Sequence, residues 1–181
     1  MILLGCTPKG RNTEQHDIFF GIGTSLSDLK TSMIDFWPEA EGKIHIDAWR
    51  EVTSVDEFRI HIVTRDEALK VSANDRLFFL NLGGYRRNEF EEYHYKILTV
   101  GENKGVAVQK AKQTSFYIHT GFEGGASSHI DDKYGVDVDD IYEIQDILPA
   151  NTKEKYSIQI SRDVNILPDE LFLGYLKMDK I

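Results

Sequence analysis

The chain has 181 residues, a net charge of −9 and a hydrophobic content of 41%, values typical of a soluble globular protein. The acidic balance makes nucleic acid an unlikely partner and disfavours docking on anionic membranes. The single cysteine, Cys6, allows no intramolecular disulfide, and no run of about eighteen apolar residues predicts a membrane span. We therefore expect a cytoplasmic protein with no membrane association.

The first half of the chain predicts two strands, a helix and two further strands. Residues 1–23 hold the first two strands, residues 25–37 the helix, and residues 43–52 and 58–62 the last two. Cys6 ends an apolar run, so we expect a packed, inert thiol there in preference to a nucleophile.

The second half predicts the same order of elements. The strands and the helix are expected at residues 77–84, 93–101, 103–117, 135–144 and 155–161. Asn103 is a good N-cap for the helix. Residues 169–178 echo the apolar strand at 75–84 and predict either an extra strand or a short helix.

The two halves align with each other. Residues 1–23 align with 79–101 without a gap, and 43–52 align with 135–144. The identities within the first pair are Leu4 with Leu82, Gly5 with Gly83, Glu14 with Glu92, His16 with His94 and Gly23 with Gly101. The alignment predicts an internal duplication and an α+β fold with mainly antiparallel sheet.

The boundaries follow from the same alignment. A degenerate first unit spans 1–65, a joint 66–76, a second unit 77–163, and a C-terminal strand or short helix 164–181. So short a joint suggests that the units pack together, and we expect one continuous sheet about a pseudo-twofold axis.

The segments LFFLNLGGYRRNEFEEYHYKILTVGENKGVAVQKAKQTSFY (77–117) and SSHIDDKYGVDVDDIYEIQDIL (127–148) resemble a small bacterial family, domain of unknown function 1543. The family occurs in one or two copies. The LGGY turn, the EFEEYHYK run, the KAK helix and HIDDKYGVDVDDI carry the resemblance, which is strongest over 77–148. The first unit has LGCT in place of LGGY. The resemblance implies the fold and the two copies, but no activity and no site residues.

Acidic residues concentrate in the stretch SSHIDDKYGVDVDDIYEI (127–144). Strict alternation along a strand puts one set of side chains on a polar face: Asp137, Asp139, Ile141 and Glu143. The aligned strand keeps the same phase, with His45, Asp47, Trp49 and Glu51 on that face. A solvated strand face is the simplest interpretation. One alternative is a contact surface for a protein or peptide. The other is a divalent metal site formed by Asp137 and Asp139, about 6.6 Å apart along the strand, with a third ligand such as His129, Asp131 or Asp132 from the preceding loop.

The LGGYRR turn is a second candidate site. Tyr85 and the two arginines after it, Arg86 and Arg87, follow a glycine pair whose amides could hold a phosphate or carboxylate together with a guanidinium. The spacing is not that of a nucleotide-binding loop, and a solvated hairpin turn is the simpler interpretation. Tyr85 and Phe90 are expected to be exposed and to mark an interface.

The third candidate is the pair His16 and His94, each beside a glutamate. Two histidines related by a pseudo-twofold axis could bind zinc or perform acid/base chemistry, whereas satisfied structural histidines are the commoner finding.

No strong catalytic motif or cofactor fingerprint is present, so we expect a non-catalytic module that binds a partner protein or another copy of itself, without a cofactor. The first alternative is a metal-dependent hydrolase that uses the acidic strand 137–143 with a nearby histidine. The second is small-anion binding at the LGGYRR turn.

Overall fold

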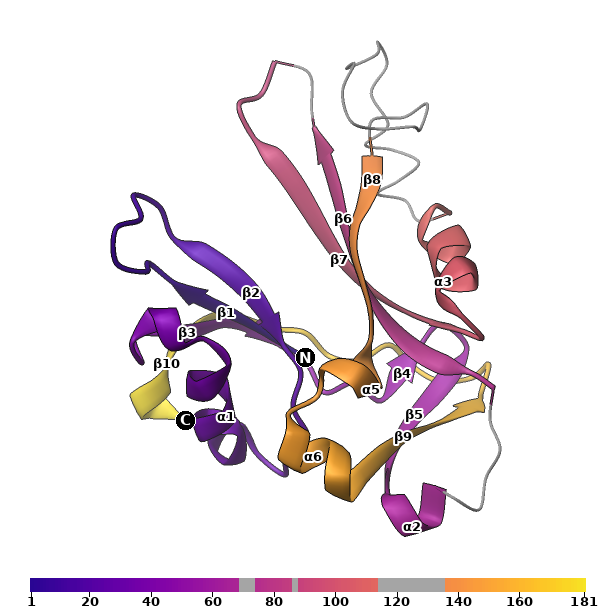
Figure 1. Ribbon diagram of the computed structural model, residues 1–181. Coiled ribbons are helices and arrows are strands. Elements are labelled where there is room, and N and C mark those ends of the chain that lie inside the picture. The colour runs from indigo at the N-terminus through magenta and orange to yellow at the C-terminus, as the bar shows by residue number, and fades with distance from the viewer. Residues whose placement is uncertain (69–73, 86–87, 114–135) are drawn as a thin grey trace.

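The computed structural model describes residues 1–68, 74–85, 88–113 and 136–181. It has short helices and three antiparallel sheets, which confirms the α+β class (Figure 1). The strands of the expected order are all present, but they do not form the single continuous sheet that the short joint suggested.

The first sheet has the strand order β10-β3-β1-β2. Its members are β1 (Ile2–Cys6), β2 (Gln15–Phe19), β3 (His45–Trp49) and β10 (Phe172–Lys177). Helix α1 (Leu26–Phe36) covers one face and is followed by the short 3-10 helix η1 (Pro38–Ala40). Ser25 caps α1 through a reciprocal pair of hydrogen bonds with Asp28, which satisfies amide groups that a helix start otherwise leaves unpaired.

The second sheet has three strands, in the order β7-β6-β8. It repeats the arrangement of β2, β1 and β3 in the first sheet. Its members are β6 (Arg76–Tyr85), β7 (Glu92–Gly101) and β8 (Val136–Glu143). Helix α3 (Lys104–Ala111) lies on one face, and Asn103 is its N-cap, as the sequence predicts. Ala107 and Ala111 lie on the buried side of this helix and are fully buried, so their small side chains allow the helix to approach the sheet closely. The short helices α5 (Ile144–Ile147) and α6 (Ala150–Lys155) follow β8.

The third sheet joins the two halves. It consists of β4 (Ser54–Val55), β5 (Phe58–Thr64) and β9 (Tyr156–Arg162), and β5 ends in the short helix α2 (Arg65–Ala68). Phe58 pairs with Arg162, and Thr64 pairs with Tyr156. Because residues 58–62 align with 156–160, this register is symmetrical about the pair His61 and Gln159.

Three apolar clusters form the core. One lies under α1, one lies under α3, and one contains residues of both halves. This shared cluster includes Ile18 of β2 and Phe20 just after it, Leu98 and Val100 of β7, and Ile60 and Ile160 of the joining sheet. The helix-free faces of the two outer sheets therefore pack together at the centre, while the hairpins diverge outward (Figure 1).

A bulge in β3 and another in β8 overturn the strict alternation expected from the sequence. The register shifts at Asp47 in β3 and at Asp139 in β8, so each aspartate is the extra residue that a bulge inserts between two paired positions. An extra residue reverses the faces that follow it. Trp49 and Ile141, which alternation placed beside the acids, pack instead against the cores under α1 and α3.

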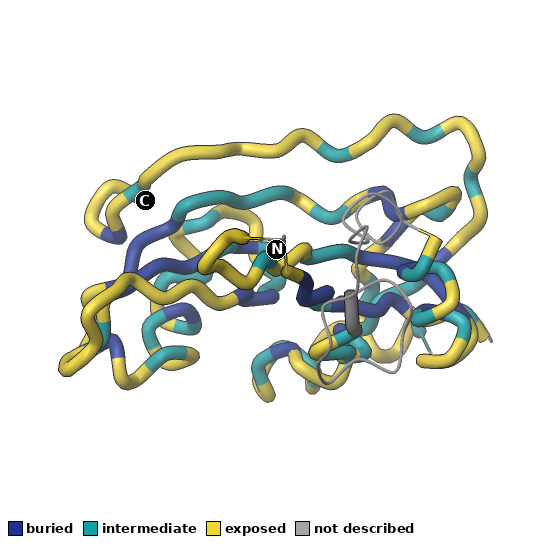
Figure 2. The backbone as a smooth tube through the Cα atoms, turned by 90° about the horizontal axis from the view of Figure 1, so that it is seen from above, coloured by how far each residue is buried: buried dark blue, intermediate teal, exposed yellow. Residues whose placement is uncertain are grey.

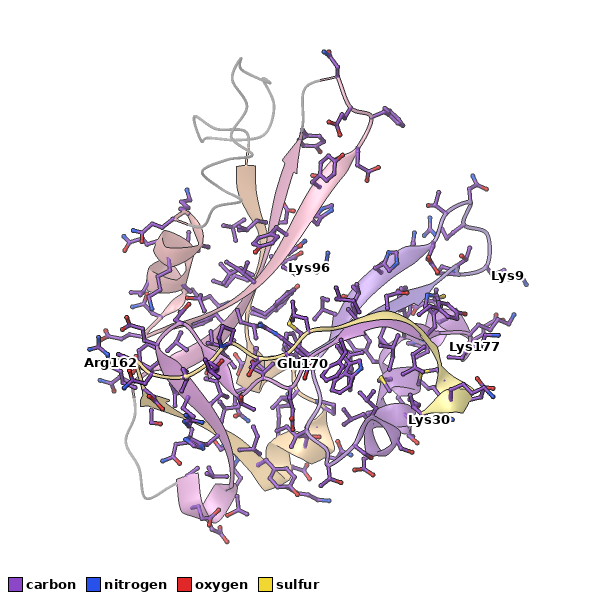
Figure 3. All side chains as sticks on the ribbon, turned by 180° about the vertical axis from the view of Figure 1, so that it is seen from behind. Lys9, Lys30, Lys96, Arg162, Glu170 and Lys177 are labelled. Carbon is purple, nitrogen blue, oxygen red and sulfur yellow. The ribbon has the colours of Figure 1, made fainter. Side chains whose placement is uncertain are left out.

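The C-terminal segment is a strand, which decides between the two interpretations of 169–178. It crosses the back of the molecule from Arg162 past Glu170 to Lys177 (Figure 3) and ends in the 3-10 helix η2 (Met178–Lys180). Most of it is exposed along one edge (Figure 2). In the part of the chain that the structure describes, no helix has the length and apolar character needed to cross a membrane.

Candidate metal centre

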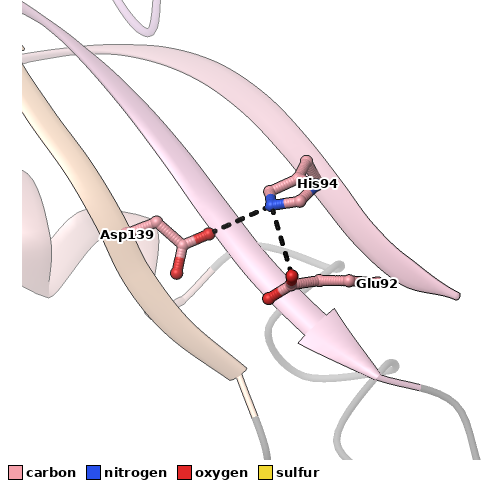
Figure 4. Close-up of side chains that lie close together, drawn as sticks. All are labelled: Glu92, His94 and Asp139. Atoms are coloured by element: carbon pink, nitrogen blue, oxygen red, sulfur yellow. Dashed lines mark ion pairs between the residues drawn. The ribbon is translucent and has the colours of Figure 1, made fainter. Parts of the chain in front are cut away.

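Glu92, His94 and Asp139 meet on the helix-free face of the sheet formed by β6, β7 and β8 (Figure 4). His94 Nε2 lies 3.5 Å from Asp139 Oδ2 and 4.0 Å from Glu92 Oε2. One potential ligand atom from each residue lies within 4.8 Å of the other two. We call these three residues the second cluster.

Glu92, His94 and Asp139 can meet because Gly83, on the strand between them, has no side chain. β7 and β8 flank β6 and lie about 9.5 Å apart, since neighbouring strands are separated by 4.7–4.9 Å. Between them, Gly83 pairs with His94 on one side and with Asp137 on the other. A Cβ atom at Gly83 would collide with the Asp139 carboxylate. Glycine at this position therefore makes room for the cluster.

The bulge at Asp139 is the second feature that brings these three side chains together. Leu82 pairs with Val138 and Asn81 pairs with Asp140, so Asp139 is the residue that the bulge inserts. Bulges bend a strand and redirect one side chain, and they are frequent next to active sites. Here the redirected carboxylate leans over Gly83 toward His94.

The second cluster is open to solvent on one side. The side chains of Glu92, His94 and Asp139 are 41%, 38% and 32% exposed. Tyr85 is paired with Glu92 in the sheet. The pKa of Tyr85 is raised, first by its hydrogen bond with Glu92 and then by burial and by the charges of Glu92 and Asp139.

This donor set suits a divalent metal ion. Imidazole nitrogen and carboxylate oxygen both bind Zn²⁺ at about 2.0–2.2 Å, which sets neighbouring ligand atoms roughly 3.3 Å apart in a tetrahedron. The observed separations of 3.5 and 4.0 Å need only a small inward movement. Three protein ligands leave coordination positions for water or a substrate, as in catalytic metal sites.

A corresponding group, the first cluster, lies on the helix-free face of the first sheet. It consists of Glu14, His16, His45 and Asp47. Asp47 Oδ2 lies 3.3 Å from His16 Nε2, and Asp47 Oδ1 lies 3.3 Å from His45 Nε2. Glu14 Oε1 lies 3.0 Å from His45 Nε2, and Glu14 Oε2 lies 3.7 Å from His16 Nε2. Imidazoles and carboxylates therefore alternate around a ring.

The two clusters are built in the same way. Gly5 pairs with His16 and His45, and a Cβ atom there would collide with the Asp47 carboxylate and the His45 ring. Asp47 is the inserted residue of a bulge at the position that corresponds to Asp139. One ligand type differs between the clusters, because His45 of the first half aligns with Asp137 of the second.

The structure brings together some of the predicted site residues and not others. His94 and Asp139 belong to the second cluster, and their third partner is Glu92 of β7. His16 and His94 do not share one site in the way that the pair hypothesis required, because each contacts carboxylates of its own half. Arg86, Arg87 and His129 lie outside the described residues, as does the side chain of Asp137. Anion binding at the LGGYRR turn therefore stays a prediction.

Sequence reasoning missed His45 as a candidate and did not connect Glu92 with Asp139. The signal was present in the alignment of the halves. A glycine inside a strand, a histidine on one neighbouring strand and an aspartate on the other recur at matched positions. What alternation alone could not supply was the bulge that points each aspartate across the glycine.

Residues 11–62 match the model of a family described as Domain of Unknown Function (DUF1543). The match lies within the first half of the chain, whereas the resemblance seen in the sequence was placed most strongly on 77–148. The matched segment contains every residue of the first cluster.

No curated protein matches the chain. Among solved structures, protein Il1583 from Idiomarina loihiensis is similar, with a TM-score of 0.64 and 20% sequence identity. The alignment covers 98% of this chain and 94% of that one. At so low an identity, this likeness shows a shared fold and does not extend to function.

Proposed function

We propose that the protein binds a divalent metal ion through Glu92, His94 and Asp139. The observation that carries the proposal is the convergence of three ligand atoms within 4.8 Å over a glycine that leaves them room. One imidazole and two carboxylates favour Mn²⁺ or Zn²⁺ over Ca²⁺, which prefers an all-oxygen shell.

A metal titration tests the proposal. Metal-stripped protein is titrated with Mn²⁺ and with Zn²⁺ by calorimetry, as wild type and as Asp139→Asn and His94→Ala. We expect each variant to lose at least about 100-fold in affinity at this site, because losing a direct ligand costs more than the 10–100-fold typical of losing a residue behind it. Asp140→Asn and His61→Ala are matched controls, with the same chemical change outside the cluster. Equal losses in variants and controls would refute the proposal.

Metal-dependent hydrolysis is the activity that such a site would support. Glu92, His94 and Asp139 would hold the ion, and the ion would supply activated water for hydrolysis near neutral pH. The exposure of the cluster gives substrates access. Hydrolysis of simple phosphate and carboxylate esters, measured with and without added Mn²⁺, tests this activity, and Asp139→Asn is the inactive control.

Protein interaction or self-association is a second candidate function. It is favoured by large apolar side chains exposed along the C-terminal segment: Val164, Leu167, Leu171, Leu173 and Tyr175. Single exposed apolar residues are ordinary on protein surfaces, whereas several along one exposed segment offer a contact surface. Sedimentation of the wild type and of Leu173→Lys tests the candidate. A mass above one chain that falls in the variant would support it, and a monomeric wild type would leave only a separate partner protein.

The internal repeat belongs to the same proposal. We infer two copies of one metal-binding unit, supported by the matching glycines, the matching bulges and the symmetrical pairing of β5 with β9.

A cytoplasmic location is supported by the lone, buried Cys6 thiol. The pKa of this thiol is raised by burial and by the charge of Glu14.

A further inference from the structure

We propose that the first cluster is a second metal site of a different class, which takes a zinc-type cation through Glu14, His16, His45 and Asp47. The proposal stands independently of metal binding at the second cluster, because it rests on other residues. It begins from the ring described above, in which each imidazole Nε2 lies between oxygens of two carboxylates.

The His45 side chain is buried without a hydrogen bond at Nε2, which indicates that a ligand binds there. The residue is only 7% exposed, and its Nε2 atom makes no hydrogen bond. Glu14 Oε1 lies 3.0 Å from this atom and Asp47 Oδ1 lies 3.3 Å from it. The distances are therefore short enough for a hydrogen bond, but the angles are not suitable. Asp47 Oδ2 is also buried without a hydrogen bond. Buried polar atoms are rarely left unsatisfied, and a cation at the centre of the ring would engage both.

The composition of the ring indicates the class of cation. Two imidazoles and two carboxylates supply the nitrogen and oxygen donors, four in all, of a closed tetrahedral site, which suits Zn²⁺ and its spectroscopic substitute Co²⁺. The second cluster, with three protein ligands from its described side chains, is the open type. In the described residues, only the second cluster brings all its ligand atoms within 4.8 Å of one another. A cation at the first cluster would therefore draw the exposed Glu14 side chain inward.

The surroundings of the ring fit a closed site. The ring of Tyr175 on β10 packs against the His45 ring, with the centroids 4.4 Å apart. The sheet of the second half has no such strand beside β8 among the described residues. β10 thus shields one wall of the first cluster, and Gly5 forms its floor.

The alternative occupant is a pair of protons. If both imidazoles are protonated, the ring alternates positive and negative charges and no metal is needed. Metal content separates the two cases: the protein is purified, stripped of metal, loaded with Zn²⁺ and measured by elemental analysis after dialysis. We expect two equivalents in the wild type and one each in Glu14→Gln and Asp139→Asn. Glu14 is exposed, so its replacement leaves the fold intact.

Co²⁺ distinguishes the geometries. Tetrahedral Co²⁺ absorbs visible light far more strongly than six-coordinate Co²⁺. The Asp139→Asn variant leaves only the first cluster able to bind Co²⁺ tightly, so it is the background for this test. We expect the strong band in Asp139→Asn, and its loss when Glu14→Gln or His45→Asp is added to that variant.

The outcomes separate this proposal from the previous one. One Zn²⁺ equivalent in the wild type, unchanged in Glu14→Gln and absent in Asp139→Asn, would overturn the first site and leave the second. One equivalent lost only in Glu14→Gln would do the reverse. No bound metal in any form would overturn both.

Discussion

Replacing Gly83 by alanine is the sharpest test of the second cluster, because it adds one methyl group and removes no ligand. The Cβ atom would collide with the Asp139 carboxylate. This carboxylate is the end of a side chain that is about one third exposed, so it can rotate away from the methyl group. Its rotated position no longer faces His94, and the metal ion loses one of its ligands.

The two contributions to stability have opposite signs. Within a strand, alanine is favoured over glycine by roughly 0.5–1 kcal/mol, which offsets the cost of moving the carboxylate. The metal-free variant should therefore unfold within about 1 kcal/mol of the wild type. A metal ion at a hundred times its dissociation constant stabilises the wild type by about 2.7 kcal/mol. For a chain of this length that is a rise of roughly 5–11 °C in the unfolding midpoint.

Thermal unfolding with EDTA and with Mn²⁺ measures both quantities. Gly83→Ala should match the wild type in EDTA and lose the Mn²⁺-dependent rise. Gly5→Ala makes the same change at the corresponding position of the first cluster. It leaves the second cluster untouched, so it should keep the Mn²⁺-dependent rise whatever its midpoint in EDTA. A full metal response in Gly83→Ala would refute the role assigned to the glycine, and a midpoint that falls steeply in EDTA would refute the argument that the carboxylate can move freely.

Further predictions concern the fold and its pH dependence. Asp56→Asn should lower the free energy of unfolding in urea by about 1–2 kcal/mol. The Asp56 carboxylate accepts hydrogen bonds from Thr99 Oγ1 and from a backbone amide of β7, and asparagine tolerates the left-handed backbone at this turn. The pKa of Asp28 is lowered, chiefly by the hydroxyl of Thr24, so its stabilising effect is present above the unfolded pKa of about 3.9 and is lost as the pH falls through the lower folded value. Asp28→Asn should thus destabilise the protein at pH 6 and make little difference at strongly acidic pH; an equal difference at both pH values would contradict this. Cys6 is 1% exposed and its thiol pKa is raised by burial, so a thiol reagent should label it only after unfolding; rapid labelling of the folded protein would show that the first strand is accessible.

Much of the fold could be predicted from local patterns. The strand β7 begins one residue before its expected start, and α3 begins after the expected cap at Asn103. These elements have strong signals, namely alternating β-formers and an N-cap side chain. The extra strand β10 was ambiguous, because apolar runs of that length form helices and strands alike. Its partner, β3, lies more than a hundred positions away in the sequence, so only tertiary pairing could decide.

The candidate sites were predicted in pieces. The alignment placed Gly5 on Gly83 and His16 on His94, and it matched Asp47 with Asp139. Strict alternation then left the aspartates as a solvated strand face, because it carries no information about which side chain a bulge redirects. The pairing of β7 and β8 on opposite sides of β6 was the other missing fact, since a metal site depends on which strands are neighbours.

The symmetrical register of β5 and β9 has a consequence for the sheet edges of the two halves. Each half contributes one strand to a sheet that neither half can complete alone. A protein made of a single copy would leave the edge of β5 unpaired. We expect such a protein to pair that edge with a second molecule across the same axis. In the present chain that edge is closed within one molecule, because β9 of the second half pairs with β5 of the first. The two halves are therefore held in a fixed register although their sequences differ, as they do where His45 aligns with Asp137.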